Sequence, residues 1–234
     1  MKTIAIISAL ESEQEYFREQ FKPVKKDKFN HYEIYVSEFE DKKIINCVCG
    51  IGKVNSAALT QRIIDIYNPD LVINCGVCGG LDKSLTFDEV ILADKLKYHD
   101  INLDIFSDNI PYTDTFEADS ETLKKLYEIM TQENLKHRIG LIVTGDQFIS
   151  TTEKQEELFE KYHALGTEME GCSIAHTCYL NNVKFLVIRS LSDFADDDAD
   201  DEFYNNLEEK TKKAAHSVVA VSYTNLTLPT KRIV

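Results

Sequence analysis

The amino-acid sequence predicts an α/β fold: a three-layer α/β/α single domain with a central mixed, twisted β-sheet. Short apolar runs alternate along the chain with longer amphipathic runs, as they do where strands and helices take turns. Several of the short runs are nearly continuous Val, Ile and Leu, which is typical of strands covered on both faces. The length of 234 residues is enough for such a domain to bury a sizeable core.

The predicted strands follow the short apolar runs in chain order. The first is Thr3–Ser8, in an N-terminal segment with only about 8 apolar-leaning residues before charge begins, too few for a signal peptide. The others are expected at His31–Ser37, Lys43–Cys49, Leu71–Cys75, Glu89–Leu96, Arg138–Thr144, Ala164–Glu168 and Lys184–Ser190. No run approaches the roughly 20 apolar residues of a membrane-spanning helix. We therefore expect a cytoplasmic protein with no membrane partner.

The predicted helices follow the longer runs. They are expected at Glu11–Phe21, Val54–Tyr67, Ser120–Asn134, Thr152–Tyr162, Gly171–Leu180 and Phe203–Val221. In Val54–Tyr67 the apolar residues fall mostly on one face, as in a helix that covers a sheet. Asp119 directly precedes the third helix and is its predicted N-cap, because a carboxylate there can accept from first-turn amides.

The segment after the last predicted helix belongs to no element of this pattern. "SYTNLTLPTKRIV" (Ser222 to Val234) ends the helical periodicity abruptly and contains three threonines and a proline. We interpret it as an expression or sequencing scar, with a genuine C-terminal arm as the alternative. The predicted organisation is therefore one domain over residues 1–221, followed by an atypical tail over 222–234.

The charge of the chain argues against nucleic acid as a partner. Lys and Arg total 26 against 40 Asp and Glu, which gives a net charge of −14. Such a chain repels nucleic acid and anionic membranes unless it carries a local basic patch. The densest basic run, "KKDK" (Lys25 to Lys28), is short and interrupted by Asp27, so we interpret it as a solvated turn.

The cysteines suggest a reducing compartment rather than a metal site. All six, Cys47, Cys49, Cys75, Cys78, Cys172 and Cys178, lie in or beside apolar runs. "CGVC" has the spacing of a redox or zinc motif, but a zinc site would need a second such pair, and Cys47 and Cys49 are wrongly spaced. We interpret the six as small buried thiols in a reducing cytoplasm, and expect no metal and no cofactor.

Acids and glycines follow several predicted strands. In α/β sheets ligands bind at the carboxyl ends of the strands. There the chain has "SALESE", "GIGK", "GVCGG", "TGDQFI", "EMEG" and "SLSDFADDD". The glycine segments match neither a Walker loop nor the dinucleotide-binding pattern. Their glycines suit a turn or a close approach of the backbone to a ligand.

Together these segments resemble a known family. "IAIISALESE", "GIGKVNSA", "PDLVINCGVCGGL", "KYHD", "GLIVTGDQFI", "TEMEGCSIAHTC" and "VIRSLSDFAD" occur in the order seen in the nucleoside phosphorylase and hydrolase superfamily. Within it, the chain is most similar to the bacterial 5'-methylthioadenosine/S-adenosylhomocysteine nucleosidases, from Lys2 to about Val221. The resemblance implies a nucleoside-phosphorylase-like sheet and hydrolysis of the bond between adenine and the sugar of 5'-thio-substituted adenosines.

The resemblance implies two catalytic carboxyl groups. Asp193 would donate a proton to N7 of adenine, which near pH 7 requires a raised pKa. The acidic run from Asp193 to Asp201 would push the pKa upward, although from Asp196 onward we interpret it as a solvated loop. Glu13 would activate the attacking water from the start of a helix, where the dipole favours its ionised form.

The resemblance also implies a ribose site in "TEMEG". Glu170 would accept a hydrogen bond from the 2'-hydroxyl, and its charge would favour a cationic sugar in the transition state. Met169 would pack under the ribose. Glu168 is either a partner behind the site or a member of a structural ion pair, and Arg189 would pair with these acids and orient them.

Further residues correspond to the family's base and 5'-group contacts. Phe148 would stack on adenine, the backbone of Phe148 and Ile149 would bind its edge, and Ser192 would support Asp193. Phe203 would be the first residue of the last helix and would close over the base as a lid. Cys78 and Gly79 would contact the substrate. The apolar 5'-pocket would be formed by Leu10, Ile51 and, from a second subunit, Leu103 and Phe106. The resemblance therefore implies a homodimer.

Two departures and two alternatives remain. The family usually has a small polar residue and then alanine where this chain has Val77 and Cys78, and the segment from Ile105 to Phe116 matches poorly. The first alternative is a phosphorylase of the same fold, although no arginine precedes "GVCGG" and Glu13 would repel phosphate. The second is a nucleoside-binding protein without catalysis.

Overall fold

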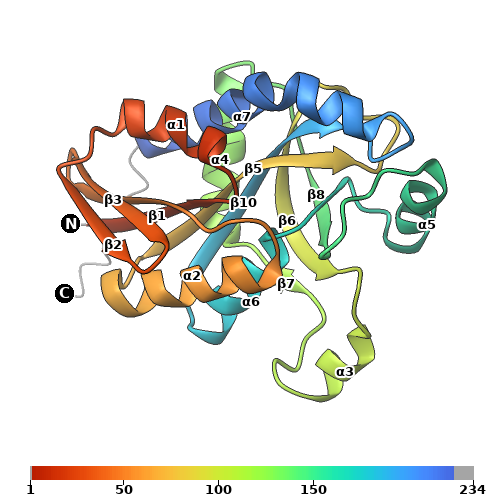
Figure 1. Cartoon of the computed structure of the whole chain (residues 1–234), viewed down its shortest axis with the longest axis horizontal. Coiled ribbons are helices and arrows are strands. Elements are labelled where there is room, and N and C mark those ends of the chain that lie inside the picture. Colours follow the sequence, from red (N-terminus) through yellow and green to blue (C-terminus); the bar gives the residue numbers. More distant parts are fainter. Residues whose placement is uncertain (1, 224–234) are drawn as a thin grey trace.

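The structure, a computed structural model, describes residues 2–223 and shows a mixed sheet between two layers of helices (Figure 1). The strand order is β10-β6-β8-β9-β5-β1-β4-β3-β2, with β7 paired to β6 and an additional pairing of β10 with β5. The strands are β1 (Lys2–Ser8), β2 (Lys25–Phe29), β3 (Tyr32–Phe39), β4 (Lys42–Val48), β5 (Leu71–Gly80), β6 (Val90–Tyr98), β7 (Phe116–Glu117), β8 (His137–Thr144), β9 (Gly166–Glu168) and β10 (Lys184–Asp193). Since β10 pairs with both β5 and β6, one half of the sheet closes on itself.

The helices cover both faces of this sheet. Helices α1 (Glu11–Gln20), α4 (Ser120–Gln132) and α7 (Ala199–Tyr223) pack together on one face, and α2 (Lys53–Tyr67) and α6 (Gly171–Leu180) on the other (Figure 1). Helix α5 (Thr152–Tyr162) follows β8, and the short α3 (Leu103–Asp108) stands away from the sheet. The Asp119 side chain accepts from the Thr122 amide at the start of α4, so the predicted cap is confirmed. The three-layer mixed α/β fold is confirmed as well.

The interpretation of Lys25–Lys28 as a turn was wrong. These residues form β2, which pairs antiparallel with β3 from Lys25↔Val36 to Phe29↔Tyr32. The strand lies at the edge of the sheet and none of its side chains is fully buried. It therefore lacks the apolar alternation by which strands are predicted. Asp27 is held by Lys25 at 2.8 Å and by the Tyr67 hydroxyl at 2.7 Å, which stabilises the hairpin on α2.

Strand β5 is longer than predicted and includes the whole of "GVCGG". Its residues Gly76–Gly79 pair with β10 instead of forming a loop. The glycines are needed there for space: a Cβ at Gly76 would lie 2.3 Å from a carboxylate oxygen of Glu13, and one at Gly79 2.8 Å from Asp193. The backbone thus approaches the protein's own acids closely. Of the two interpretations of these glycines, a turn or a close approach to a ligand, the turn was wrong.

Smaller differences concern short elements and the end of the chain. Helix α3 and strand β7 were not predicted because each is too short to show a period. Helix α7 begins at Ala199 rather than Phe203 and continues through Ser222 and Tyr223. The rest of the proposed scar, residues 224–234, lies outside the described residues. Within residues 2–223, no helix combines the length and apolar character needed to cross a bilayer.

Candidate active site

A cavity of about 410 Å³ lies at the carboxyl ends of β1, β5, β9 and β10. It is lined by twelve of the residues predicted for the site: Leu10, Glu13, Ile51, Cys78, Gly79, Phe148, Ile149, Met169, Glu170, Ser192, Asp193 and Phe203. It is also lined by Ala9, Val77, Gln147, Thr167, Glu168, Asp200 and Tyr204. Its volume suits a small organic molecule. We call Glu13, Glu168, Glu170 and Asp193 the cavity floor, and Phe148, Asp200, Phe203 and Tyr204 the cavity mouth.

Glu13 is held in the floor by backbone amides. It lies in the first turn of α1 and is 4% exposed. One carboxylate oxygen accepts from the amides of Ala9 at 2.8 Å and Leu10 at 2.9 Å, and the other from Val77 at 3.1 Å. Burial raises the pKa of Glu13, while the positive charge of Arg189 and the three amide donors oppose the rise. The result is a buried carboxyl group, fixed in orientation, at the cavity wall.

Asp193 ends β10 on the same cavity. Its Oδ2 accepts from the Ser192 hydroxyl at 2.6 Å, and its Oδ1 from the Ala195 amide at 2.8 Å. Burial raises the pKa of Asp193 to about 6, and these two hydrogen bonds limit the rise. A carboxyl group with this pKa is still protonated in about a tenth of the molecules at pH 7, so it can donate a proton.

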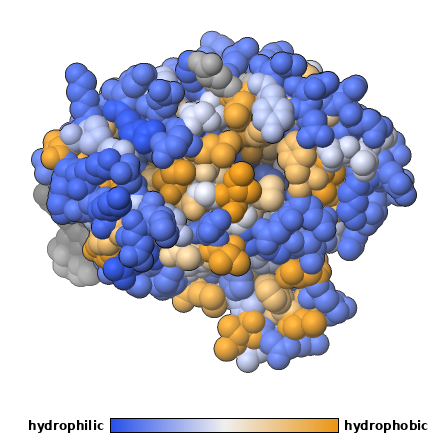
Figure 2. Space-filling view, in the orientation of Figure 1, coloured by the Kyte–Doolittle hydropathy of each residue, from blue (hydrophilic) through white to orange (hydrophobic). Residues whose placement is uncertain are grey.

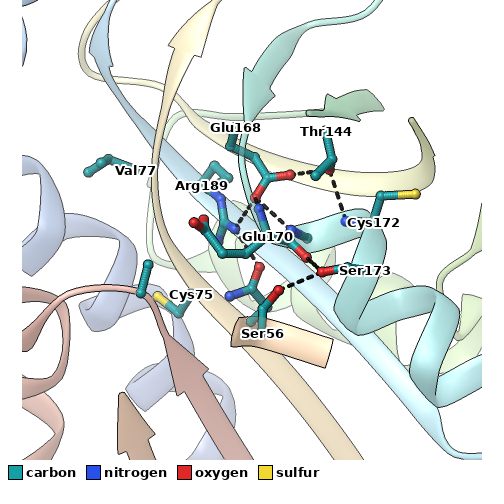
Figure 3. Close-up of polar contacts among 12 residues, drawn as sticks. Ser56, Cys75, Val77, Thr144, Glu168, Glu170, Cys172, Ser173 and Arg189 are labelled. Atoms are coloured by element: carbon teal, nitrogen blue, oxygen red, sulfur yellow. Dashed lines mark hydrogen bonds and ion pairs between the residues drawn. The ribbon is translucent and has the colours of Figure 1, made fainter. Parts of the chain in front are cut away.

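Glu168 forms a buried ion pair with Arg189 at the cavity floor (Figure 3). Its Oε2 lies 2.6 Å from Nη2 of Arg189 and accepts from the amides of Glu170 at 2.9 Å and Gly171 at 2.6 Å. Its Oε1 accepts from the Thr144 hydroxyl. The structural ion pair, one of two roles left open by the sequence, is therefore formed.

Glu170 lies beside this pair and faces the cavity. It is the residue before α6, and its Oε1 accepts from the Gly52 amide at 2.9 Å. Burial and the adjacent Glu168 raise the pKa of Glu170, and Arg189 opposes them. Burial opposes the charge of Arg189, but the three nearby carboxyl groups of Glu168, Glu170 and Glu13 outweigh it and raise the pKa of Arg189.

The cavity mouth is aromatic and more exposed. The rings of Phe148 and Phe203 meet edge to face, with centroids 5.6 Å apart, and Phe148 is 45% exposed. Because α7 begins earlier than predicted, Phe203 lies in its second turn and does not open the helix. Asp200 and Asp201 lie in the first turn of this helix, so the interpretation of the acidic run as a loop was wrong for both, and Asp200 lines the cavity.

Three predicted residues do not line the cavity. Arg189 lies behind Glu168, as an orienting residue would. Leu103 and Phe106 lie on α3 and pack against the main core, where Phe106 meets the rings of Tyr98 and His176 at 5.8 and 5.5 Å. Whether a second subunit presents them to the site stays a prediction.

Some lining residues were missed by the sequence analysis. Gln147 lies inside the segment "TGDQFI", Thr167 precedes Glu168, and Tyr204 follows Phe203, so each adjoins a predicted residue. Their position next to predicted site residues was the available signal, but their side chains suggested no catalytic or binding role. All six cysteines are buried and free, as interpreted. Among residues 2–223, no three His, Cys, Asp or Glu side chains are grouped to hold a metal ion.

Fold and site together define an α/β protein of the phosphorylase class, since residues 3–222 match the family model described as the Phosphorylase superfamily. A 5'-methylthioadenosine/S-adenosylhomocysteine nucleosidase from Staphylococcus aureus is 33% identical over 223 residues, which cover 93% of this chain and 98% of that protein. The chain belongs to the phosphorylase superfamily and, within it, to the family of these nucleosidases, as the resemblance implied.

Solved structures agree in fold over nearly the whole chain. The 5'-methylthioadenosine/S-adenosylhomocysteine nucleosidase from Neisseria meningitidis, in complex with methylthio-immucillin-A, has a TM-score of 0.89 and 32% identity, over 95% of this chain and 99% of that one. The futalosine hydrolase of Helicobacter pylori has a TM-score of 0.89 and 28% identity, over 94% and 97%.

Proposed function

We propose that the protein is a hydrolase that cleaves the N-glycosidic bond of 5'-thio-substituted adenosines, methylthioadenosine and S-adenosylhomocysteine among them, to adenine and the thioribose. The observation that carries the proposal is the meeting of Glu13, Glu170 and Asp193, far apart in the sequence, on one cavity. The names of the relatives support the same reaction class.

In this proposal Asp193 is the general acid and Glu13 the general base. Glu13 takes a proton from water, and the water oxygen attacks the anomeric carbon of the sugar. The bond to the base breaks, its electron pair passes into the adenine ring, and N7 receives the proton of Asp193. The pKa of Asp193, raised by burial to about 6, suits a general acid, which works best with a pKa near the working pH. Burial also raises the pKa of Glu13, while Arg189 and three amide donors favour the ionised form that a base needs.

Glu170 and Met169 would hold the ribose. The Gly52 amide fixes one oxygen of Glu170, and the 2'-hydroxyl would donate to the carboxylate from the cavity. As the bond breaks, positive charge grows on the sugar. An ionised carboxylate beside the ribose would stabilise that charge.

The cavity mouth would bind the base. Phe148 and Phe203 would stack on and close over adenine, the backbone of Phe148 and Ile149 would bind its edge, and Cys78 and Gly79 would contact it from β5. Leu10 and Ile51 would contact the 5'-thio group.

We also propose the homodimer implied above, with Leu103 and Phe106 completing the 5'-pocket of the partner. Apolar surface over the protruding α3 segment supports it (Figure 2). There Ile105, Ile110 and Tyr112 are between 56% and 71% exposed, which is costly unless another surface covers them. Six unpaired thiols support a reducing cytoplasm as the compartment.

A phosphorylase is less well supported. The cavity lining contains no lysine or arginine within the described residues, whereas a phosphate dianion needs such groups or a nest of free amides. The amides of Ala9, Leu10 and Val77 already donate to Glu13.

The deciding experiment is incubation of the protein with methylthioadenosine, with and without phosphate, while adenine release is followed. Equal release under both conditions is expected. Release that depends on phosphate would identify a phosphorylase, and binding without release a non-catalytic protein. The matched variant is Glu13→Gln, which should lose about a hundredfold or more in kcat; unchanged hydrolysis would remove Glu13 as the base.

A further inference from the structure

Three loops at the carboxyl edge of the sheet are joined by one carboxylate outside the cavity. Asp100, which follows β6, accepts with Oδ2 from Nζ of Lys53 at 2.6 Å and from the Asp146 amide at 2.8 Å. Asp146 in turn accepts with Oδ1 from the Lys53 amide at 2.8 Å. The three residues thus form a closed set of hydrogen bonds, and none of them lines the cavity.

The two loops tied by Asp100 both contribute to the site. The loop after β4 carries Ile51 and Gly52, and the Gly52 amide donates to Glu170. The loop after β8 carries Gln147, Phe148 and Ile149. Lys53, pinned through both its amide and its ammonium group, directly follows the residue that donates to Glu170.

The geometry at Gly52 leaves little freedom. Its φ is +96°, and a Cβ there would lie 3.0 Å from Oδ1 of Asp146, the atom that accepts from the Lys53 amide. Asp146, whose amide donates to Asp100, thus lies directly against Gly52 and accepts from the amide of the next residue, so a shift of Asp146 would disturb the backbone at Gly52. Burial acts to raise the pKa of Asp100, but Lys53 and the Asp146 amide lower it below its ordinary value, so the carboxylate that holds the loops is ionised at neutral pH.

We propose that Asp100 is a positioning residue that aims the Gly52 amide at Glu170 and so fixes the carboxylate that binds the ribose 2'-hydroxyl. The inference rests on the proposed function. It assigns Asp100 no contact with the substrate. Its effect passes through Lys53 and Gly52 to Glu170.

The test compares Asp100→Asn with wild type on methylthioadenosine and on its 2'-deoxy counterpart. If the Glu170 carboxylate is displaced by a fraction of an ångström in this variant, kcat/KM with the ribonucleoside should fall by about tenfold. With the 2'-deoxynucleoside, which lacks the hydroxyl bound by Glu170, the loss should shrink to about twofold. Equal losses with both substrates, or no loss, would overturn the proposal.

The matched control is Asp119→Asn. Asp119 also accepts from a lysine, Lys184 at 2.9 Å, and from a backbone amide, Thr122 at 2.9 Å, but it caps α4 away from the cavity. The kcat/KM of the Asp119→Asn variant should stay within about twofold of wild type with both substrates. If Asp100→Asn does not fold, Lys53→Met removes the same ion pair and should show the same dependence on the 2'-hydroxyl. Wild type inactive on both nucleosides would instead refute the proposed function, and the inference with it.

Discussion

The floor and the mouth of the cavity differ in how their side chains are held. In the floor, Glu13, Glu168 and Asp193 are buried, and backbone amides or neighbouring side chains fix their carboxylate oxygens. At the mouth, Phe148 is 45% and Tyr204 78% exposed, and Phe203 touches Phe148 through ring edges. The difference indicates that the groups proposed for bond cleavage are preorganised, whereas Phe148 and Tyr204 at the mouth are open to solvent.

The strongest test of this contrast is Asp193→Asn. The amide keeps the size of the side chain but is not acidic enough to transfer a proton to N7, so kcat should fall by about 10² to 10⁴. Affinity for methylthioadenosine, measured by calorimetry, should change little because the mouth is untouched. Near-normal turnover would remove Asp193 as the acid.

The next largest effect is expected on stability, from Arg189→Met. The substitution leaves Glu168 buried without its cation, which should lower the free energy of unfolding by about 3–5 kcal/mol in urea titrations. The double variant Arg189→Met, Glu168→Gln should recover much of this loss. A single variant as stable as wild type would show that the floor is not held by the ion pair.

The pH profile of the wild-type protein tests the acid of the floor, and the profile of a mouth variant serves as its control. Asp193 donates in its protonated form, so kcat/KM should fall as pH rises through about 6, approaching tenfold for each further pH unit. Burial raises this pKa, and a later fall, above pH 8, would mean that a different group is the acid. In Phe148→Ala, the fall in kcat/KM should occur at the same pH as in wild type.

The smallest effect is expected at the mouth. Phe148→Ala removes the proposed stacking partner of adenine, and base–aromatic stacking contributes about 1–3 kcal/mol. KM should therefore rise about tenfold while kcat changes little, in steady-state assays. A fall in kcat as large as that of Asp193→Asn would erase the distinction between mouth and floor.

The sequence was informative where burial and chain order decide the outcome. Acids that directly follow apolar strands, such as Asp193, were expected on one sheet edge, and the structure brings them onto one cavity. Strands with both faces covered were predicted from their apolar runs for the same reason.

Features that depend on pairing between distant segments were not predictable in this way. Lys25–Phe29 is a strand because β3 pairs with it, not because its own residues favour one. Gly76 has no side chain, and the Glu13 carboxylate occupies the space that a side chain would need. The two residues are 63 positions apart, and a single sequence carries no signal for such a contact. The link from Lys53 through Asp100 to Asp146 is hidden for the same reason.

The charged edge strand β2 has a consequence for how copies of the protein can meet. An open strand edge invites a further strand from another molecule, and lysines on it discourage such growth. Lys25 and Lys28 are exposed there, at the end of a sheet whose opposite half is closed on itself. At high protein concentration, the lysines therefore disfavour backbone hydrogen bonding between the β2 strands of two molecules.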